Sequence, residues 1–235
     1  MRLLLFSNST NAGEEYLSYT LPYIKEFLTE NEKEAVFIPF AGISVGFDAY
    51  THMVSGKLGS IGLRIKSLHQ VRDKIKMIRE ASCIIIGGGN TFYLLKLLQD
   101  ENLLDPIREE VKAGKPFIGW SAGSNVTCPT ICTTNDMPIV EPADFTALDL
   151  IPFQINPHYT DVVLKQHAGE TREMRINEYI LANHHRFVAG LREGTLLEIK
   201  KDMIRLKGNK PCRIFHYGQE TVEVSPGQDL GFLLK

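Results

Sequence analysis

Short apolar runs alternate with longer amphipathic stretches over the first two-thirds of the chain. The runs predict strands at RLLLFS (2–7), AVFIPF (35–40), LRIKSL (63–68), CIIIGG (83–88) and PFIGWS (116–121). Apolar runs without polar alternation are typical of strands buried on both faces. Between them the pattern predicts helices at 12–30, 46–58, 73–80 and 90–113, the last broken near Asp105-Pro106. This order predicts a doubly wound α/β domain with a mainly parallel sheet flanked by helices, which binds ligands beyond the carboxyl ends of its strands.

The pattern changes after residue 150. FQINPHY (153–159) predicts a strand that ends in a proline-enforced loop, and 170–183 predicts a helix. From Phe187 onward, short β-like runs predict a meander of antiparallel strands, with turns at KGNK and SPGQ. No linker or repeat divides the chain. We therefore expect a single domain over 1–235, with an α/β core over 1–186 and a C-terminal antiparallel β extension over 187–235.

Composition excludes several classes of function. The 235 residues are 43% hydrophobic and carry a formal net charge of −2, which gives no reason to expect nucleic acid or an anionic membrane surface as a partner. The longest apolar runs are too short to span a bilayer. MRLLLFSNST at the N-terminus reads as a first strand because its apolar part is short and no cleavage-site pattern follows. The sequence leaves the oligomeric state open, with a homodimer as one option.

The cysteines indicate an intracellular protein without a metal centre. The chain has 4 cysteines, too few for a dense disulfide framework: Cys83, Cys128, Cys132 and Cys212. Cys128 and Cys132 are close in sequence but lack a second Cys or His pair nearby, as a zinc site would need. We expect free thiols, a cytoplasmic location and no cofactor.

The clearest chemical motif is GWSAG (119–123), which fits the G-x-S-x-G pattern of a nucleophile elbow. It follows a predicted buried strand and can open a helix, so Ser121 would project above the sheet edge. Gly119 and Gly123 would allow strand and helix to approach closely. The pattern alone is weak, because a simple strand-to-helix turn would give the same letters.

A serine nucleophile needs a base, and the base needs a carboxylate. His158 follows Pro157 at the end of a predicted strand, which places it at the same sheet edge as Ser121. Asp136 and Glu193 both fit the role of the acid, and the residues alone leave the choice open. The competing interpretations are a loop histidine, an Asx turn at Asp136 and a solvated hairpin tip at Glu193.

Three consecutive glycines in IIIGGGNTFYLL (84–95) predict a loop with exposed amides between a strand and a helix. A dinucleotide fingerprint would need another glycine where Phe92 stands. An oxyanion hole fits better, with one N–H near Gly89 and one from Ala122. Asn90 is a candidate helix cap and also a candidate contact with substrate.

Several blocks, in order along the chain, resemble the peptidase E (α-aspartyl dipeptidase) family of serine peptidases: LLLFSNST (3–10), AVFIPFAG (35–42), IIIGGGNTFYLLK (84–96), IGWSAGSN (118–125), TTNDMPIV (133–140), DLIPFQINPHYTD (149–161) and GETRE (169–173). The resemblance implies a glutamine-amidotransferase-like α/β fold in which serine replaces the cysteine nucleophile. It implies hydrolysis of dipeptides with an N-terminal aspartate. Ser121 is then the nucleophile, His158 the base, and Asp136 or Glu193 the acid.

An aspartyl substrate carries a side-chain carboxylate that a forked guanidinium would bind well. Arg172 in GETRE is the first candidate and Arg175 the second, although both could instead pair with neighbouring glutamates along a helix. Ser124 and Cys132 depart from the family pattern, and we expect them to border the site. The alternatives are a cyanophycinase-like hydrolase on the same fold and a non-catalytic module that binds an anionic metabolite.

Overall fold

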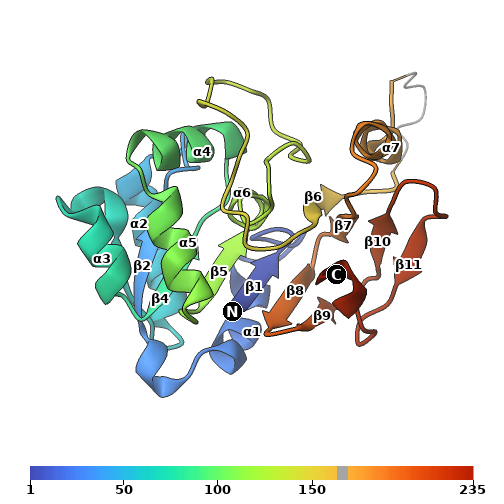
Figure 1. The fold of residues 1–235 in the computed structure, drawn as a ribbon. Coiled ribbons are helices and arrows are strands. Elements are labelled where there is room, and N and C mark those ends of the chain that lie inside the picture. The colour runs from blue at the N-terminus through green and yellow to red at the C-terminus, as the bar shows by residue number, and fades with distance from the viewer. Residues whose placement is uncertain (163–168, 235) are drawn as a thin grey trace.

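A seven-stranded sheet forms the centre of the computed structural model, which describes residues 1–162 and 169–234 (Figure 1). The strand order is β3-β2-β4-β5-β1-β8-β9. The parallel part contains β1 (Arg2–Phe6), β2 (Glu34–Ile38), β3 (Arg64–Ser67), β4 (Cys83–Ile86) and β5 (Phe117–Trp120). Next to β1, β8 (Thr195–Lys200) and β9 (Met203–Gly208) pair in antiparallel fashion. The predicted α/β class with a mainly parallel sheet is confirmed.

Both faces of the central strands β1, β2, β4 and β5 are buried, which explains their unbroken apolar runs, whereas the edge strands β3 and β9 carry exposed residues. In β1, Leu3 and Leu5 pack into one core cluster, whereas Leu4 and Phe6 pack into the other. Helices α1 (Leu21–Phe27) and α2 (Phe47–Gly59) cover the face of Leu4. The opposite face is covered by α3 (Lys74–Glu80), α4 (Thr91–Asp100), α5 (Leu104–Lys112) and α6 (Ala122–Asn125).

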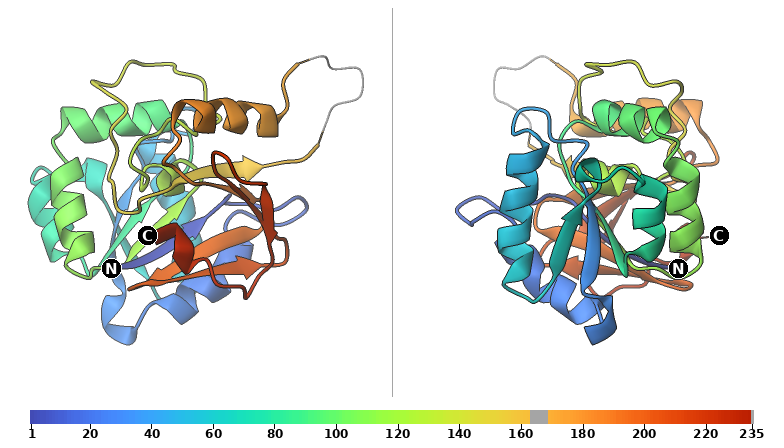
Figure 2. Two further views of the ribbon diagram at one scale, coloured as in Figure 1. Left: turned by 45° about the vertical axis from the view of Figure 1, so that its right-hand side comes forward. Right: turned by 90° about the vertical axis from the view of Figure 1, so that its left-hand side faces the viewer.

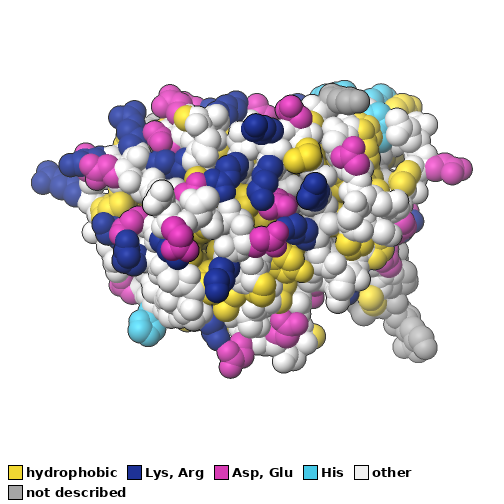
Figure 3. Space-filling view, turned by 90° about the horizontal axis from the view of Figure 1, so that it is seen from below, with side chains coloured by type: hydrophobic (Ala, Val, Ile, Leu, Met, Phe, Trp, Pro, Cys, Tyr) yellow, Lys and Arg dark blue, Asp and Glu magenta, His cyan; other side chains and the backbone are white. Residues whose placement is uncertain are grey.

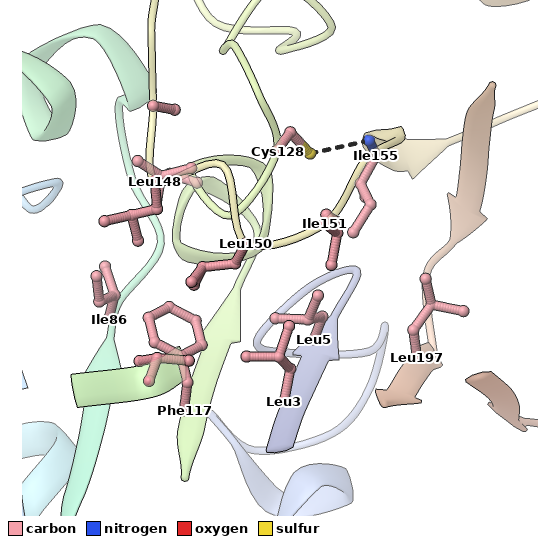
Figure 4. Close-up of a cluster of buried hydrophobic side chains, with 14 of the residues drawn as sticks. Leu3, Leu5, Ile86, Phe117, Cys128, Leu148, Leu150, Ile151, Ile155 and Leu197 are labelled. Atoms are coloured by element: carbon pink, nitrogen blue, oxygen red, sulfur yellow. Dashed lines mark hydrogen bonds between the residues drawn. The ribbon is translucent and has the colours of Figure 1, made fainter. Parts of the chain in front are cut away.

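The long connection over residues 126–153, which follows α6, completes the cover over Leu3 and Leu5. Figure 4 shows Leu148, Leu150 and Ile151 from this connection above the sheet strands. The Ile155 N–H donates to Cys128 Sγ at 3.1 Å, which ties the connection to the strand that follows it. The segment after Ser121 is thereby fixed against the core and delivers the next strand to the carboxyl edge of the sheet.

A second, four-stranded sheet lies beside the first, in the order β11-β10-β7-β6 (Figure 2). It consists of β6 (Gln154–Tyr159), β7 (Val188–Arg192), β10 (Cys212–Phe215) and β11 (Val222–Val224). Helix α7 (Arg172–Ala182) packs on it through Ile176 and Ile180. Short 3₁₀ helices occur at Ser18–Thr20, Glu30–Glu32, Leu68–Gln70 and Gly231–Leu234.

The C-terminal strands differ in arrangement from the predicted meander. They divide between the two sheets: β8 and β9 extend the main sheet, and β7, β10 and β11 build the second one. In addition, β6 and β7 pair in parallel. Periodicity shows that a segment is a strand but carries no information about its partner. The single domain with a boundary near residue 186 stays a prediction, although one core cluster includes side chains from both sheets.

Two helix predictions need correction. The segment 12–30 contains only a short 3₁₀ turn and α1, because Gly13 and Leu17 adopt positive φ angles of 81° and 58° and bend the chain before the helix. The break expected near Pro106 lies earlier, where Asn102 has a φ of 54° between α4 and α5. Pro106 sits in the first turn of α5, where its missing N–H costs no helical hydrogen bond.

The described residues contain no helix long and apolar enough to cross a membrane. All 4 cysteines are free thiols, as predicted, and only Cys132 is exposed. On the face seen in Figure 3, acidic and basic side chains are interspersed rather than gathered by sign.

Candidate active site

Ser121 occupies a sharp turn between β5 and α6. Its backbone has φ 53° and ψ −114°, a conformation that costs a non-glycine residue about 1–3 kcal/mol. A Cβ on Gly123 would lie 2.1 Å from the carbonyl oxygen of Ile86, and one on Gly119 would lie 2.4 Å from that of Gly123. The glycines are therefore required for the close approach of strand and helix, as the sequence predicted.

His158 comes to Ser121 from the second sheet. Its Nε2 lies 3.0 Å from Ser121 Oγ. The residue sits at a register shift in β6 and has a φ of 53°, so the strand turns the imidazole toward the main sheet. The His158 N–H donates to Ser7 Oγ at 2.9 Å, and the Ser7 hydroxyl donates to the Leu191 carbonyl at 2.7 Å. Ser7, directly after β1, thus holds the imidazole-bearing strand in place.

Glu193 lies in the tight turn between β7 and β8, and its Oε1 is 2.7 Å from His158 Nδ1. The turn is fixed because the Gly194 N–H donates to Asn8 Oδ1 at 2.9 Å. The side chains of His158 and Glu193 are 41% and 49% exposed, so water screens their attraction. The contact therefore acts more through alignment of the ring than through charge.

Asp136, the other candidate acid, does not face the imidazole. Its carboxylate accepts hydrogen bonds from the Thr91 N–H at 2.7 Å and from the Thr91 hydroxyl at 2.6 Å. A carboxylate at this position satisfies a free N–H at the start of α4 and complements the helix dipole. The structure brings Glu193, and not Asp136, to His158.

The glycine-rich loop after β4 lies directly against Ser121. A Cβ on Gly88 would be 3.0 Å from Ser121 Cβ, and one on Gly89 would be 2.1 Å from the Ala41 carbonyl oxygen. Gly89 has a φ of 137°, which other residues rarely adopt. Within residues 1–162 and 169–234, the N–H groups of Gly89 and Ala122 have no hydrogen-bond acceptor in the protein. Both predicted amide donors are therefore free of acceptors among these residues. Ala122 follows Ser121 in the chain, and Gly89 belongs to the loop that lies against Ser121.

A cavity of about 600 Å³ opens in front of Ser121 and His158. Its lining combines apolar side chains, which include Ile43, Val45, Met53 and Ile139, with polar ones, which include Asn90, Thr91, Asn135 and Asp136. The Asn90 side chain caps α4 by accepting from the Tyr93 N–H at 3.0 Å, as predicted, and also donates to the Met137 carbonyl. In the described parts of the chain, no three His, Cys, Asp or Glu side chains are grouped as a metal site requires.

The two candidate arginines on α7 have different surroundings. The Arg172 guanidinium donates to Asn135 Oδ1, a residue of the cavity wall, and its Nε is buried without a hydrogen-bond partner among the described residues. Burial, together with the neighbouring charge of Arg175, lowers the pKa of Arg172. Arg175 faces away, with its Nε 3.6 Å from Glu170, and lines a different pocket.

The two departures from the family pattern do not line the cavity. Ser124 is buried beneath the turn, where its hydroxyl lies 2.7 Å from the Phe6 carbonyl and 2.9 Å from that of Gly119. Cys132 lines the separate pocket beside Arg175. Ser124 does border the nucleophile, since its N–H donates to the Ser121 carbonyl at 2.9 Å, but from below the turn, where its side chain ties β1 to β5. For Cys132 the expectation is wrong, because that residue lies on another surface.

Sequence reasoning missed Ser7, Asn8 and Asn135, which hold His158, the Glu193 turn and Arg172 respectively. For Ser7 and Asn8, the sequence did contain a signal. SNS (7–9) begins at the last residue of the first predicted strand, so its polar side chains had to lie at the carboxyl edge where the site forms. Asn135 lies in an irregular segment, whose path no periodicity predicts.

A family comparison decides where the protein belongs. The family model described as "Peptidase family S51" matches residues 3–207 of this chain. The chain belongs to peptidase family S51. A peptidase E of Nostoc sp. is 49% identical over 234 residues, which cover 100% of this chain and 97% of the relative. A peptidase E of Escherichia coli is 45% identical over 227 residues, which cover 97% of this chain and 99% of the relative.

Solved structures agree with this S51 assignment. A crystal structure of a provisionally named peptidase E protein from Listeria monocytogenes matches with a TM-score of 0.67 at 25% identity, over 88% of this chain and 98% of that one. A peptidase from an actinobacterium has a TM-score of 0.71 at 16% identity over 97% and 96%, which shows the shared fold. The predicted resemblance to the peptidase E family is confirmed, and the S51 protein described here is a serine peptidase.

The close packing around Gly123 predicts how a substitution there changes the stability of this S51 peptidase. Gly123→Ala should lower the free energy of unfolding by at least about 2 kcal/mol, because the new methyl group meets the Ile86 backbone. Gly56→Ala is the matched control, since nothing lies within 4 Å of its Cβ in α2; it should raise that free energy by up to about 1 kcal/mol. Urea unfolding followed through the 1 tryptophan measures both, and equal stabilities would contradict the packing argument.

Proposed function

We propose that this S51 peptidase hydrolyses dipeptides with an N-terminal aspartate through an acyl-enzyme on Ser121. The observation that carries the proposal is the continuous series Glu193, His158 and Ser121, joined by contacts of 2.7 Å and 3.0 Å. The full-length relatives named peptidase E support the dipeptide substrate.

In the first step, Ser121 Oγ attacks the aspartyl carbonyl carbon while His158 Nε2 accepts the hydroxyl proton. Glu193 accepts a hydrogen bond from His158 Nδ1–H, which leaves Nε2 as the acceptor facing Ser121. It also stabilises the imidazolium that forms. The turn conformation of Ser121 acts as the nucleophile elbow, since it raises the hydroxyl above the end of β5.

The carbonyl oxygen gains negative charge in the tetrahedral intermediate. The free N–H groups of Gly89 and Ala122 are the proposed donors to it. The imidazolium then protonates the leaving amino group, and the C–N bond breaks to give the aspartyl ester of Ser121. His158 next takes a proton from water, and the resulting attack on the ester releases aspartate and restores the hydroxyl.

The substrate aspartate brings a second carboxylate that must be neutralised. Arg172 is the proposed source of charge, because its guanidinium reaches the cavity wall at Asn135 and its Nε has no partner among the described residues. A guanidinium stays protonated even when burial lowers its pKa. Asn135 would hold this guanidinium at the cavity wall through its Oδ1, and Asn90 would keep the lining polar and contact the substrate.

A cytoplasmic location belongs to this proposal as well, on the basis of the free thiols, and a homodimer is one option for an oligomeric state that the sequence leaves open. They do not affect the chemistry of the site.

The substrate assignment predicts a ranking. Wild type should cleave Asp-Leu faster than Glu-Leu, Ala-Leu and an isoaspartyl dipeptide, and Ser121→Ala should lose at least about a thousand-fold in kcat. A fluorophosphonate should label wild type and not the variant. If wild type cleaves none of the four dipeptides, or if Ser121→Ala matches it on Asp-Leu, the proposal fails. Cleavage confined to aspartyl–arginine polymers would favour the cyanophycinase-like alternative.

The two acids should separate in a paired experiment. Glu193→Gln removes the acceptor that fixes the His158 tautomer, so kcat on Asp-Leu should fall by about a hundred-fold or more. Asp136→Asn weakens the start of α4 and should cost less than about ten-fold in kcat, with a loss of about 1 kcal/mol in stability. Steady-state kinetics and urea unfolding measure both. The reverse order of the two kcat losses would make Asp136 the acid.

The arginines on α7 form another matched pair. Arg172→Gln should raise KM for Asp-Leu by about ten-fold or more, because the substrate carboxylate loses its charged partner. Arg175→Gln removes a cation that faces away and should leave KM within about two-fold. Equal effects of the two substitutions on KM would contradict the role of Arg172.

A further inference from the structure

The peptide unit that joins Gly88 to Gly89 is held by a side chain outside the Ser121–His158–Glu193 series. The Tyr50 hydroxyl, on α2, donates to the Gly88 carbonyl oxygen at 3.0 Å. The contact is close, because a Cβ on the neighbouring Gly87 would lie 2.4 Å from the Tyr50 oxygen. The same loop lies against Ser121 through Gly88.

A hydrogen bond to this carbonyl also determines an N–H. The Gly88 C=O and the Gly89 N–H belong to one planar trans peptide and point in opposite directions. Glycine on both sides of the unit permits wide rotation, so the sequence itself does not fix the plane. Tyr50 restrains the carbonyl on one side and thereby aims the Gly89 N–H to the other.

Trp120 orients the proton of the Tyr50 hydroxyl. The Trp120 Nε1–H donates to the Tyr50 oxygen at 3.0 Å. An indole N–H can only donate, so the tyrosine accepts there and must direct its own proton elsewhere, toward the Gly88 carbonyl. Burial raises the pKa of Tyr50 to about 12, so the proton is present at any pH at which a peptidase of this kind works.

The three aromatic rings around this network leave little freedom. Tyr50 is 6% exposed, and its ring meets Phe37 edge-on at 5.1 Å between centroids. Phe37 in turn stacks on Trp120 at 6.0 Å with an interplanar angle of 16°. Trp120 immediately precedes Ser121 in the chain, so the side chain that orients Tyr50 is attached directly to the backbone of the nucleophile turn.

We propose that Tyr50, oriented by Trp120, is a positioning residue that fixes the Gly89 N–H as a donor to the tetrahedral intermediate. It acts through the Gly88–Gly89 peptide and need not touch the substrate. The inference rests on the proposed acyl transfer at Ser121 and adds a residue that fixes the geometry of its transition state.

Tyr50→Phe tests the inference, since it removes one hydroxyl and keeps the ring. We expect kcat on Asp-Leu to fall about ten- to a hundred-fold, less than or equal to the loss typical of deleting an oxyanion donor. KM should stay within about three-fold, and the pH profile of kcat should keep its shape because His158 and Glu193 are untouched. Tyr23→Phe is the control: it removes a hydroxyl from a tyrosine of α1 that packs on the same core cluster but does not line the cavity, and it should leave kcat unchanged.

A second measurement separates positioning from a merely structural role. An aspartyl boronate mimics the tetrahedral intermediate, whereas L-aspartate mimics only the ground state. In Tyr50→Phe, the affinity for the boronate should fall by the same factor as kcat/KM, and the affinity for L-aspartate should not change. Trp120→Phe, which keeps Tyr50 but removes the N–H that orients it, should give a smaller loss of the same kind.

The outcomes are distinct. An unchanged kcat in Tyr50→Phe, or equal losses of affinity for boronate and aspartate, would overturn the inference while leaving the acyl transfer intact. If Ser121→Ala keeps wild-type activity, the proposed function itself fails. Urea unfolding followed by far-UV circular dichroism, a readout that does not need the tryptophan removed in Trp120→Phe, shows whether each variant keeps its fold. Were Tyr50→Phe unfolded, Trp120→Phe with the same two ligands would decide the question.

Discussion

The contact of 3.0 Å between Ser121 and His158 is the constraint on which the rest of the structure depends, because the two residues come from different sheets. Ser121 follows β5 in the main sheet, and His158 is the penultimate residue of β6 in the second one. The turn that contains Glu193 joins β7 of the second sheet to β8 of the main sheet. The residue that orients the imidazole therefore sits on a direct connection between the two sheets.

Both reacting residues are held in conformations that an isolated chain would avoid. Ser121 and His158 each have a φ of 53°, at a cost of about 1–3 kcal/mol per residue. Contacts elsewhere offset this strain: glycine packing below Ser121, and the hydrogen bond from His158 N–H to Ser7. The site is thus pre-organised by its surroundings, in the way that electrostatic catalysis requires.

The sequence predicted what local patterns encode. Apolar runs indicated the parallel strands, the glycines around Ser121 indicated a close strand-to-helix turn, and the triple glycine indicated free amides. Two kinds of information were absent. Strand partners are chosen by packing across the molecule, so β7 and β8 could not be assigned to separate sheets. The choice between Asp136 and Glu193 depended on the path of irregular segments, and Tyr50 lay in a helix whose pattern gives no hint of the Gly88 carbonyl.

The most direct test of the central claim is detection of the covalent intermediate. Asp-Leu hydrolysis would be quenched with acid during steady-state turnover and the digested protein examined by mass spectrometry. The account predicts that the peptide containing Ser121 gains the mass of one aspartyl residue, attached at that serine. Rapid turnover with no adduct, or with the adduct on another residue, would contradict it.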